Sequence, residues 1–236
     1  MIQQEDKKII QIKNAMKYAF PHTIPVMTGF LVLGMAYGVL MQANGYGTLW
    51  AVLMSGIAFC GSMQFVAVSL LTSPFQPVEA FLLSLMVNAR HLFYGISMLD
   101  RFKGLGKVRL FLIYTLCDET FSISSSVQAP DGIDRRYFYF SISLLNYIYW
   151  VFATFLGGIL GSFITMNTKG LDFVLTALFV VLFMEQMKTK ENHTPGIIGI
   201  LCSIVSLIIF GPNGMVIPAM IFILFTLLVR RKALCT

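Results

Sequence analysis

The stretch SLMVNARHLFYGIS, residues 84–97, decides how the rest of the chain is interpreted. It places Asn88, Arg90 and His91 inside an apolar segment, residues 78–99, that is long enough to cross a bilayer. An ionised side chain at membrane depth costs about 2.5 to 3.5 kcal/mol on insertion scales, so such residues usually face a partner or a water-filled path. The stretch therefore predicts a membrane helix with a transport or relay function.

The composition is also that of a membrane protein. Of the 236 residues, 57% are hydrophobic and only 12% are charged, against about 25% charged in an ordinary soluble domain. Each span needs about 20 apolar residues, so this length suits about six to eight spans. We therefore expect an all-α integral membrane protein, a polytopic helical bundle of about 6–8 segments in one transmembrane domain.

The basic residues act as topology signals. The net charge is +6, but the lysines and arginines lie at the ends of apolar segments and form no continuous basic face, so no nucleic-acid partner is expected. Four lysines between positions 7 and 17 alternate with apolar residues at helical spacing. Residues 1–20 are thus predicted to form an amphipathic basic segment on the cytoplasmic surface of the bilayer. Residues 21–230 form the transmembrane domain, and residues 231–236 a short tail.

Eight apolar segments follow the basic leader. They cover about residues 24–42, 48–71, 78–99, 108–128, 137–165, 171–187, 196–210 and 215–229. Prolines, Pro25 among them, lie at or near the ends of these segments, where they stop or break helices. Eight segments need not be eight spans, because the sixth and the seventh are short.

Three complete early spans would conflict with the positive-inside rule. Basic clusters precede the first segment and follow the third, and three spans would put them on opposite sides of the membrane. Either the rule fails, or one early segment is broken or enters and leaves on one side. We expect segment 48–71 to be that one, because Ser55-Gly56 and Gly61-Ser62 interrupt it. Broken helices mark binding sites in many transporters.

Four polar clusters fall inside the apolar segments. They are Gly61-Ser62-Met63-Gln64-Phe65, Asn88-Ala89-Arg90-His91, Asp118-Glu119-Thr120-Phe121 and Leu171-Asp172-Phe173. On a helix, Asn88 shares a face with His91, and Arg90 shares a face with Tyr94. One segment thus presents both a fixed cation and a titratable ring.

The adjacent carboxylates Asp118 and Glu119 project about 100° apart on a helix, so one can pair with Arg90 while the other faces a pathway. A purely structural ion pair between two spans is the alternative, because buried charges are normally paired. A carboxylate left over beside that pair, with His91 nearby, is what a proton-coupled carrier needs.

The cluster at 61–65 has two explanations of equal weight. Ser62 and Gln64 can form hydrogen bonds between helices, or they can contact a substrate. Gly61 permits close approach of a ligand, and a helix broken here presents N–H groups to an anion. Asp172 opens an apolar segment, where the helix dipole accounts for it.

Enzymatic and metal-binding motifs are missing from the sequence. It contains no HExxH, GxSxG, P-loop or strand-linked GxGxxG pattern, and its three histidines are scattered. We expect no enzyme activity, no metal and no cofactor. The four cysteines lack CxxC or Cys/His spacing and are interpreted as small apolar residues. The aromatic run within 137–150 is typical of an interfacial belt and packing surface.

At its polar clusters the chain resembles the AzlC family, the large subunits of bacterial branched-chain amino-acid exporters. The matching stretches are Phe20-Pro21, Gly61–Phe65, Asn88–His91 with Tyr94-Gly95, Asp118–Phe121 and Leu171–Phe173. Their common order over about residues 18–190 is more specific than any one motif. The resemblance implies an inner-membrane exporter of leucine, isoleucine, valine and sometimes methionine, working with a small hydrophobic AzlD-type subunit.

A branched-chain amino acid is a zwitterion with an apolar tail, and the clusters suit each part. Its carboxylate suits Arg90 or free N–H groups near Gly61. Its ammonium suits Asp118 or Glu119, and its tail suits apolar surfaces such as Met63 and Phe65. No nucleotide motif is present, so coupling to the proton gradient is expected. A channel for another small solute, or a structural subunit of a membrane complex, remains the alternative.

Overall fold

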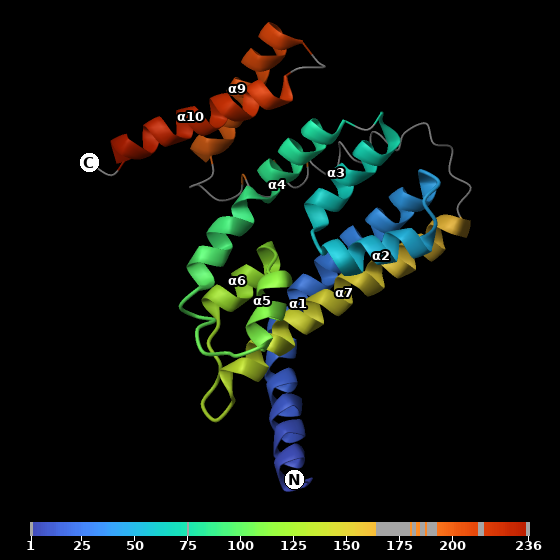
Figure 1. Ribbon diagram of the computed structural model, residues 1–236, viewed down its shortest axis with the longest axis vertical. Coiled ribbons are helices and arrows are strands. Elements are labelled where there is room, and N and C mark those ends of the chain that lie inside the picture. The colour runs from blue at the N-terminus through green and yellow to red at the C-terminus, as the bar shows by residue number, and fades with distance from the viewer. Residues whose placement is uncertain are drawn as a thin grey trace. The chain divides into compact units, whose positions relative to one another are not determined.

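The structure is a computed structural model that describes residues 2–74, 76–163, 193–211 and 215–234, with residues 180, 183, 184 and 187. Every regular element in these residues is a helix, which confirms the predicted all-α class (Figure 1). The chain divides into two compact units, Met1–Thr168 and Lys169–Thr236. Most of the predicted segment 171–187, Asp172 included, lies outside the described residues.

The first unit carries the polar clusters at 61–65, 88–91 and 118–121. Its described helices are α1 (Ile2–Ala43), α2 (Thr48–Ala58), α3 (Gly61–Thr72), α4 (Pro77–Met98), α5 (Val108–Tyr114), α6 (Asp118–Ser126) and α7 (Arg135–Phe163). The second unit contains α9 (His193–Phe210) and α10 (Val216–Leu234). Three stretches in the described residues are long and apolar enough to cross a membrane: Ile10–Ala43 of α1, then α7 and α9.

Helices α1 and α7 lie side by side along the first unit, and glycines allow their backbones to touch (Figure 1). A Cβ atom on Gly38 would lie 2.3 Å from the carbonyl oxygen of Thr154, and one on Gly157 would lie 2.1 Å from that of Met35. Only glycine fits at either position. Small residues of this kind allow the close van der Waals packing that holds membrane helices together.

Helix α1 is continuous from the basic leader into the first apolar segment. The predicted amphipathic segment 1–20 and segment 24–42 are therefore parts of one helix. Pro21 and Pro25 lie inside it, so the expectation that Pro25 marks a helix end is wrong. Membrane helices tolerate internal proline because neighbouring helices and hydroxyl side chains satisfy the backbone groups that it frees.

Helices α2 and α3 form a hairpin, the first of two. Segment 48–71 is broken as predicted, between Ala58 and Gly61. Phe59 ends α2 in the left-handed conformation, with φ of 37°. The hydroxyl of Tyr46, just before α2, donates to the carbonyl oxygen of Leu71 near the end of α3 at 3.0 Å. The hairpin therefore returns to the end of the unit where it started (Figure 1).

Helices α5 and α6 form a second hairpin in segment 108–128, whose apolar pattern had indicated one uninterrupted segment. Thr115 ends α5, and its hydroxyl donates to the carbonyl oxygen of Phe111 at 2.7 Å. Asp118 then opens α6, where a carboxylate is favoured by the helix dipole. Arg101 donates to the carbonyl oxygens of Ser124 and Val127, so the end of α6 lies beside the loop that precedes α5.

The first hairpin resolves the conflict over basic residues. Helix α1 leads away from the N-terminal lysines, the first hairpin returns to the far end, and α4 leads back. Arg135 at the start of α7 donates to the carbonyl oxygen of Arg101 at 2.9 Å, and the backbone N–H of Asp134 donates to Gln11 at 3.4 Å. The basic loop around Arg101 thus lies at the same end as the N-terminal lysines, as the positive-inside rule requires.

Candidate functional site

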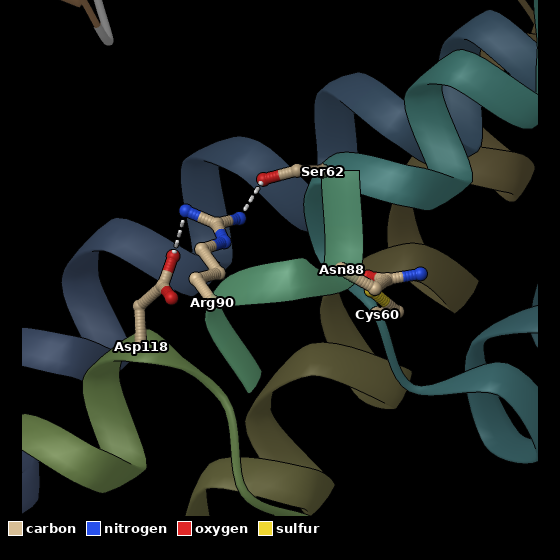
Figure 2. A network of polar contacts seen from close by, with 5 residues as sticks. All are labelled: Cys60, Ser62, Asn88, Arg90 and Asp118. Atoms are coloured by element: carbon tan, nitrogen blue, oxygen red, sulfur yellow. Dashed lines mark hydrogen bonds and ion pairs between the residues drawn. The ribbon is translucent and has the colours of Figure 1, made fainter. Parts of the chain in front are cut away.

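The tips of the two hairpins meet beside Arg90 of α4 (Figure 2). Its Nη2 donates to Oγ of Ser62, in the first turn of α3, at 2.8 Å. Its Nη1 lies 2.6 Å from Oδ2 of Asp118, the first residue of α6. The predicted pairing of Arg90 with one of the two carboxylates is therefore present. A single guanidinium joins both tips.

Polar atoms remain free around this ion pair. Nε of Arg90, Nδ1 of His91 and Oδ1 of Asp118 are buried atoms that find no hydrogen-bond partner in the described residues. Buried polar groups are normally bonded to a partner. The side chains of Arg90 and Asp118 are 33% and 35% exposed, so the site is not sealed. The site thus offers one donor, one carboxylate acceptor and one imidazole nitrogen to a polar ligand.

The hairpin tips also touch through a tyrosine. The hydroxyl of Tyr114, the last residue of α5, donates to the carbonyl oxygens of Gly56 and Ile57 at 2.5 and 2.8 Å. Tyr147 of α7 donates to the same oxygen of Gly56 at 2.8 Å. The last four carbonyls of a helix have no partner within it, so both hydroxyls cap the broken end of α2. Neither role follows from the sequence, because nothing in the spacing identifies a partner 58 or 91 residues away.

Asn88 and Tyr94 extend the site along α4. Sγ of Cys60, the residue before α3, donates to Oδ1 of Asn88 at 2.8 Å (Figure 2). Cys60, interpreted from the sequence as a small apolar residue, also donates a hydrogen bond to the site. The ring of Tyr94 stacks on Phe121 of α6 with centroids 4.4 Å apart, and the ring of His91 lies 5.7 Å from that of Tyr94. These aromatic contacts join α4 to α6 beside the ion pair.

Gln64 and Phe65 belong to the core. Nε2 of Gln64 donates to Ser55 at 2.9 Å, and its Oε1 accepts from the indole N–H of Trp150 at 2.7 Å. Gln64 is 1% exposed, and Phe65 is 5% exposed with its ring 5.6 Å from that of Tyr37. For Gln64 the contacts match the alternative of hydrogen bonding between helices.

The other predicted site residues are placed as follows. A Cβ atom on Gly61 would lie 3.2 Å from the indole ring of Trp150, so the ring accounts for the glycine. Met63 and Glu119 are half-buried. Within the described part of the chain Glu119 joins no ion pair, and no group of three or more histidine, cysteine or acidic side chains is placed to hold a metal ion.

Comparison with known proteins identifies relatives of this chain. The sequence model of the family described as AzlC protein matches residues 25–164, which include both hairpins and Arg90. The chain is 50% identical to the branched-chain amino acid transport protein AzlC of Bacillus subtilis (strain 168), over 95% of this chain and 88% of that protein.

Two further relatives are membrane proteins by name. A membrane protein of Haemophilus influenzae is 38% identical, over 97% of this chain and 94% of its own length. The inner membrane protein YgaZ of Escherichia coli (strain K12) is 25% identical, over 77% of this chain and 78% of its own length. No solved structure matches. The hairpin tips lie in the region that the family model covers.

Proposed function

Because this chain belongs to the AzlC family, whose members are transport proteins and not enzymes, we propose that it exports branched-chain amino acids across the bacterial inner membrane. The relative that is 50% identical is named for branched-chain amino acid transport. The chain is a multi-pass helical membrane protein. Leucine, isoleucine and valine are the proposed substrates, with methionine as a further one.

The observation that carries this proposal is the ion pair at the hairpin tips. Arg90 and Asp118 place opposite charges side by side, and each keeps one buried atom, Nε and Oδ1, without a partner among the described residues. An amino acid carries the complementary charges on one carbon atom. Its carboxylate can accept from the guanidinium, and its ammonium can donate to the free carboxylate oxygen; charge-assisted hydrogen bonds of this kind are the strong ones.

The apolar tail of the substrate is assigned to Met63. Its side chain is half-buried and follows Ser62, which contacts Arg90. A thioether side chain has three rotatable bonds and fits apolar groups of different shape, which suits leucine, isoleucine and valine alike. Phe65 is left out of this role because it is packed against Tyr37.

Proton coupling is assigned to His91 and the two carboxylates. An unperturbed imidazole titrates at about pH 6.5. Nδ1 of His91, beside the ion pair, is buried and has no hydrogen-bond partner in the part of the chain that the structure describes. Glu119 follows Asp118 and is half-buried. A proton held on one of these groups would change the charge that faces the substrate, which is how we propose that the gradient drives export.

A small hydrophobic AzlD-type subunit is the proposed partner. Helix α4, which carries Arg90, exposes an apolar stripe that a second helix would cover. Its residues are Val78, Leu85 and Leu92 on α4, with Leu99 directly after the helix, between 49% and 70% exposed. They recur every seven positions, the spacing that packs one helix against another. This stripe supports a partner subunit on α4.

The test is efflux of preloaded leucine from cells with and without this chain, each with and without the small subunit. Export against a concentration gradient, present only when both proteins are present, is expected. Leucine that only equilibrates would favour a channel for small solutes. Efflux that continues when Arg90 is neutralised, with assembly alone reduced, would favour a structural subunit.

A further inference from the structure

We infer that Tyr114 is a positioning residue that holds the two hairpin tips together around the substrate site. Its hydroxyl donates to the carbonyl oxygens of Gly56 and Ile57, at 2.5 and 2.8 Å. Tyr114 is the last residue of α5, in the second hairpin, whereas both acceptors lie in the last turns of α2, in the first. The inference rests on the proposed transport function, because it concerns the shape of that site.

The acceptors at the broken end of α2 are well suited to such a link. Helix α2 ends at Ala58, so its last carbonyls have no partner within the helix. Two hydroxyls reach this end from different parts of the unit. Tyr147 comes from α7, the helix that packs along α1. Tyr114 comes from the opposing hairpin, so its bond joins the two tips directly.

The link sets the spacing of the charged groups. Asp118 follows Tyr114 by four residues, across the break Thr115–Cys117, and Ser62 follows Ile57 by five, across the break at Phe59 and Cys60. Arg90 bridges Ser62 and Asp118 and can do so only while these two groups stay close. By tying Ile57 to Tyr114, the hydroxyl fixes the gap that Arg90 spans. Release of the hydroxyl lets the tips part.

Tyr114, which lies outside the charged cluster, thereby takes part in the transport step in which the two hairpin tips separate. The first hairpin enters the unit from one end and the second from the other. A carrier must open its binding site to each side of the membrane in turn. Hairpin tips that meet over the substrate therefore have to separate. The Tyr114 bonds hold the closed arrangement and must break in that step.

The chain provides a natural reporter at each tip. Cys60 precedes α3 and Cys117 precedes α6. The experiment uses two backgrounds, each with one of these thiols and serine at the other three cysteines, in membranes that contain the full transport complex. Tyr114→Phe keeps the ring and removes the hydroxyl. Tyr147→Phe is the matched control, because it removes a bond to the same carbonyl from α7.

We expect Tyr114→Phe to raise the maleimide labelling rate at both tips about three- to tenfold, the range set by the net free energy of a hydrogen bond. It should raise the half-saturation concentration for leucine by a similar factor with the maximal rate kept. Tyr147→Phe should raise labelling at Cys60 alone.

Unchanged labelling of Cys117 in Tyr114→Phe, or an equal rise in the labelling of Cys117 in Tyr147→Phe, overturns the inference. Failure of Tyr114→Phe to accumulate in the membrane also overturns it, because the hydroxyl would then serve stability. If the unmodified complex exports no leucine, the proposed function fails, and the labelling comparison still decides whether Tyr114 joins the tips.

Discussion

Nη1 of Arg90 and Oδ2 of Asp118 lie 2.6 Å apart, on two different helices. Arg90 lies on α4, and Asp118 opens α6 at the tip of the second hairpin. The same guanidinium reaches Ser62 at the tip of the first hairpin. The ion pair is thus both a contact between helices and the centre of the proposed binding site.

The ion pair predicts non-additive mutations. Arg90→Gln or Asp118→Asn alone leaves one charge without its partner, and each should lower stability by about 2 kcal/mol or more. The double variant should cost less than the sum, with a coupling energy of about 1 to 3 kcal/mol. Unfolding in detergent or bilayer measures this. Glu119→Gln, beside the pair, is the control. Strictly additive losses would argue against the contact.

Proton coupling predicts a split between two modes of transport. His91→Gln, Asp118→Asn or Glu119→Gln should abolish efflux driven by a pH gradient if that group carries the proton. At least one of the three should keep substrate binding or substrate-for-substrate exchange. Both modes are measured in vesicles at matched protein levels. An unchanged pH dependence in all three variants would leave the proton relay without support.

Ser62 and Gln64 should differ in what they affect. Gln64→Leu leaves the indole N–H of Trp150 and the hydroxyl of Ser55 without this partner, so it should lower stability by about 1 to 3 kcal/mol. Ser62→Ala loses the contact to Arg90 and should lower transport while the protein accumulates normally. Protein yield and efflux rate are measured together. If Gln64→Leu accumulates normally but loses transport, Gln64 contacts the substrate and the assignment to the core is wrong.

The contact between α1 and α7 predicts a sharp difference between glycines. Gly157→Ala would push a methyl group to 2.1 Å from the backbone oxygen of Met35. It should therefore destabilise the protein by about 1 to 3 kcal/mol. Gly29→Ala in α1 meets no atom within 4 Å and should be neutral or slightly stabilising. Thermal unfolding of both variants decides this, and equal midpoints would be inconsistent with the close helix contact.

The exposed stripe on α4 predicts dependence on a partner. The chain should be inactive or unstable alone and should co-purify with the small hydrophobic subunit. Leu92→Asn, at a position 65% exposed, should reduce co-purification. Leu110→Asn, 75% exposed on α5 and outside the stripe, is the control. A monodisperse, transport-competent preparation of this chain alone would defeat the idea.

Much of this architecture could be predicted from the sequence. The apolar segments, the break in 48–71 and the pairing of Arg90 with a carboxylate follow from composition, from the positive-inside rule and from the cost of an unpaired buried charge. The break in 108–128 did not follow, because its apolar pattern runs through Thr115. The helix breaks where the hydroxyl of Thr115 bonds to the backbone carbonyl of Phe111 and where the carboxylate of Asp118 favours the start of a new helix, α6.

The tertiary contacts of the site were harder to predict. Asn88 contacts Cys60, and Gln64 contacts Trp150, 86 residues away. Helical spacing identifies residues that share a face, but it does not identify the neighbour across that face. Ser62 and Gln64 illustrate this, because they lie two residues apart, yet one faces Arg90 and the other is in the core.

The returning hairpins change how compartments should be assigned to the connecting loops. Because the hydroxyl of Tyr46 reaches the carbonyl of Leu71, the loops on either side of the first hairpin lie at the same end of the unit. Epitopes inserted there should be recognised from one compartment. An epitope in the loop 127–134 should be recognised from the opposite compartment, together with the N-terminus. Counting every apolar segment as a crossing would assign the loop after α3 and the basic loop around Arg101 to the wrong sides.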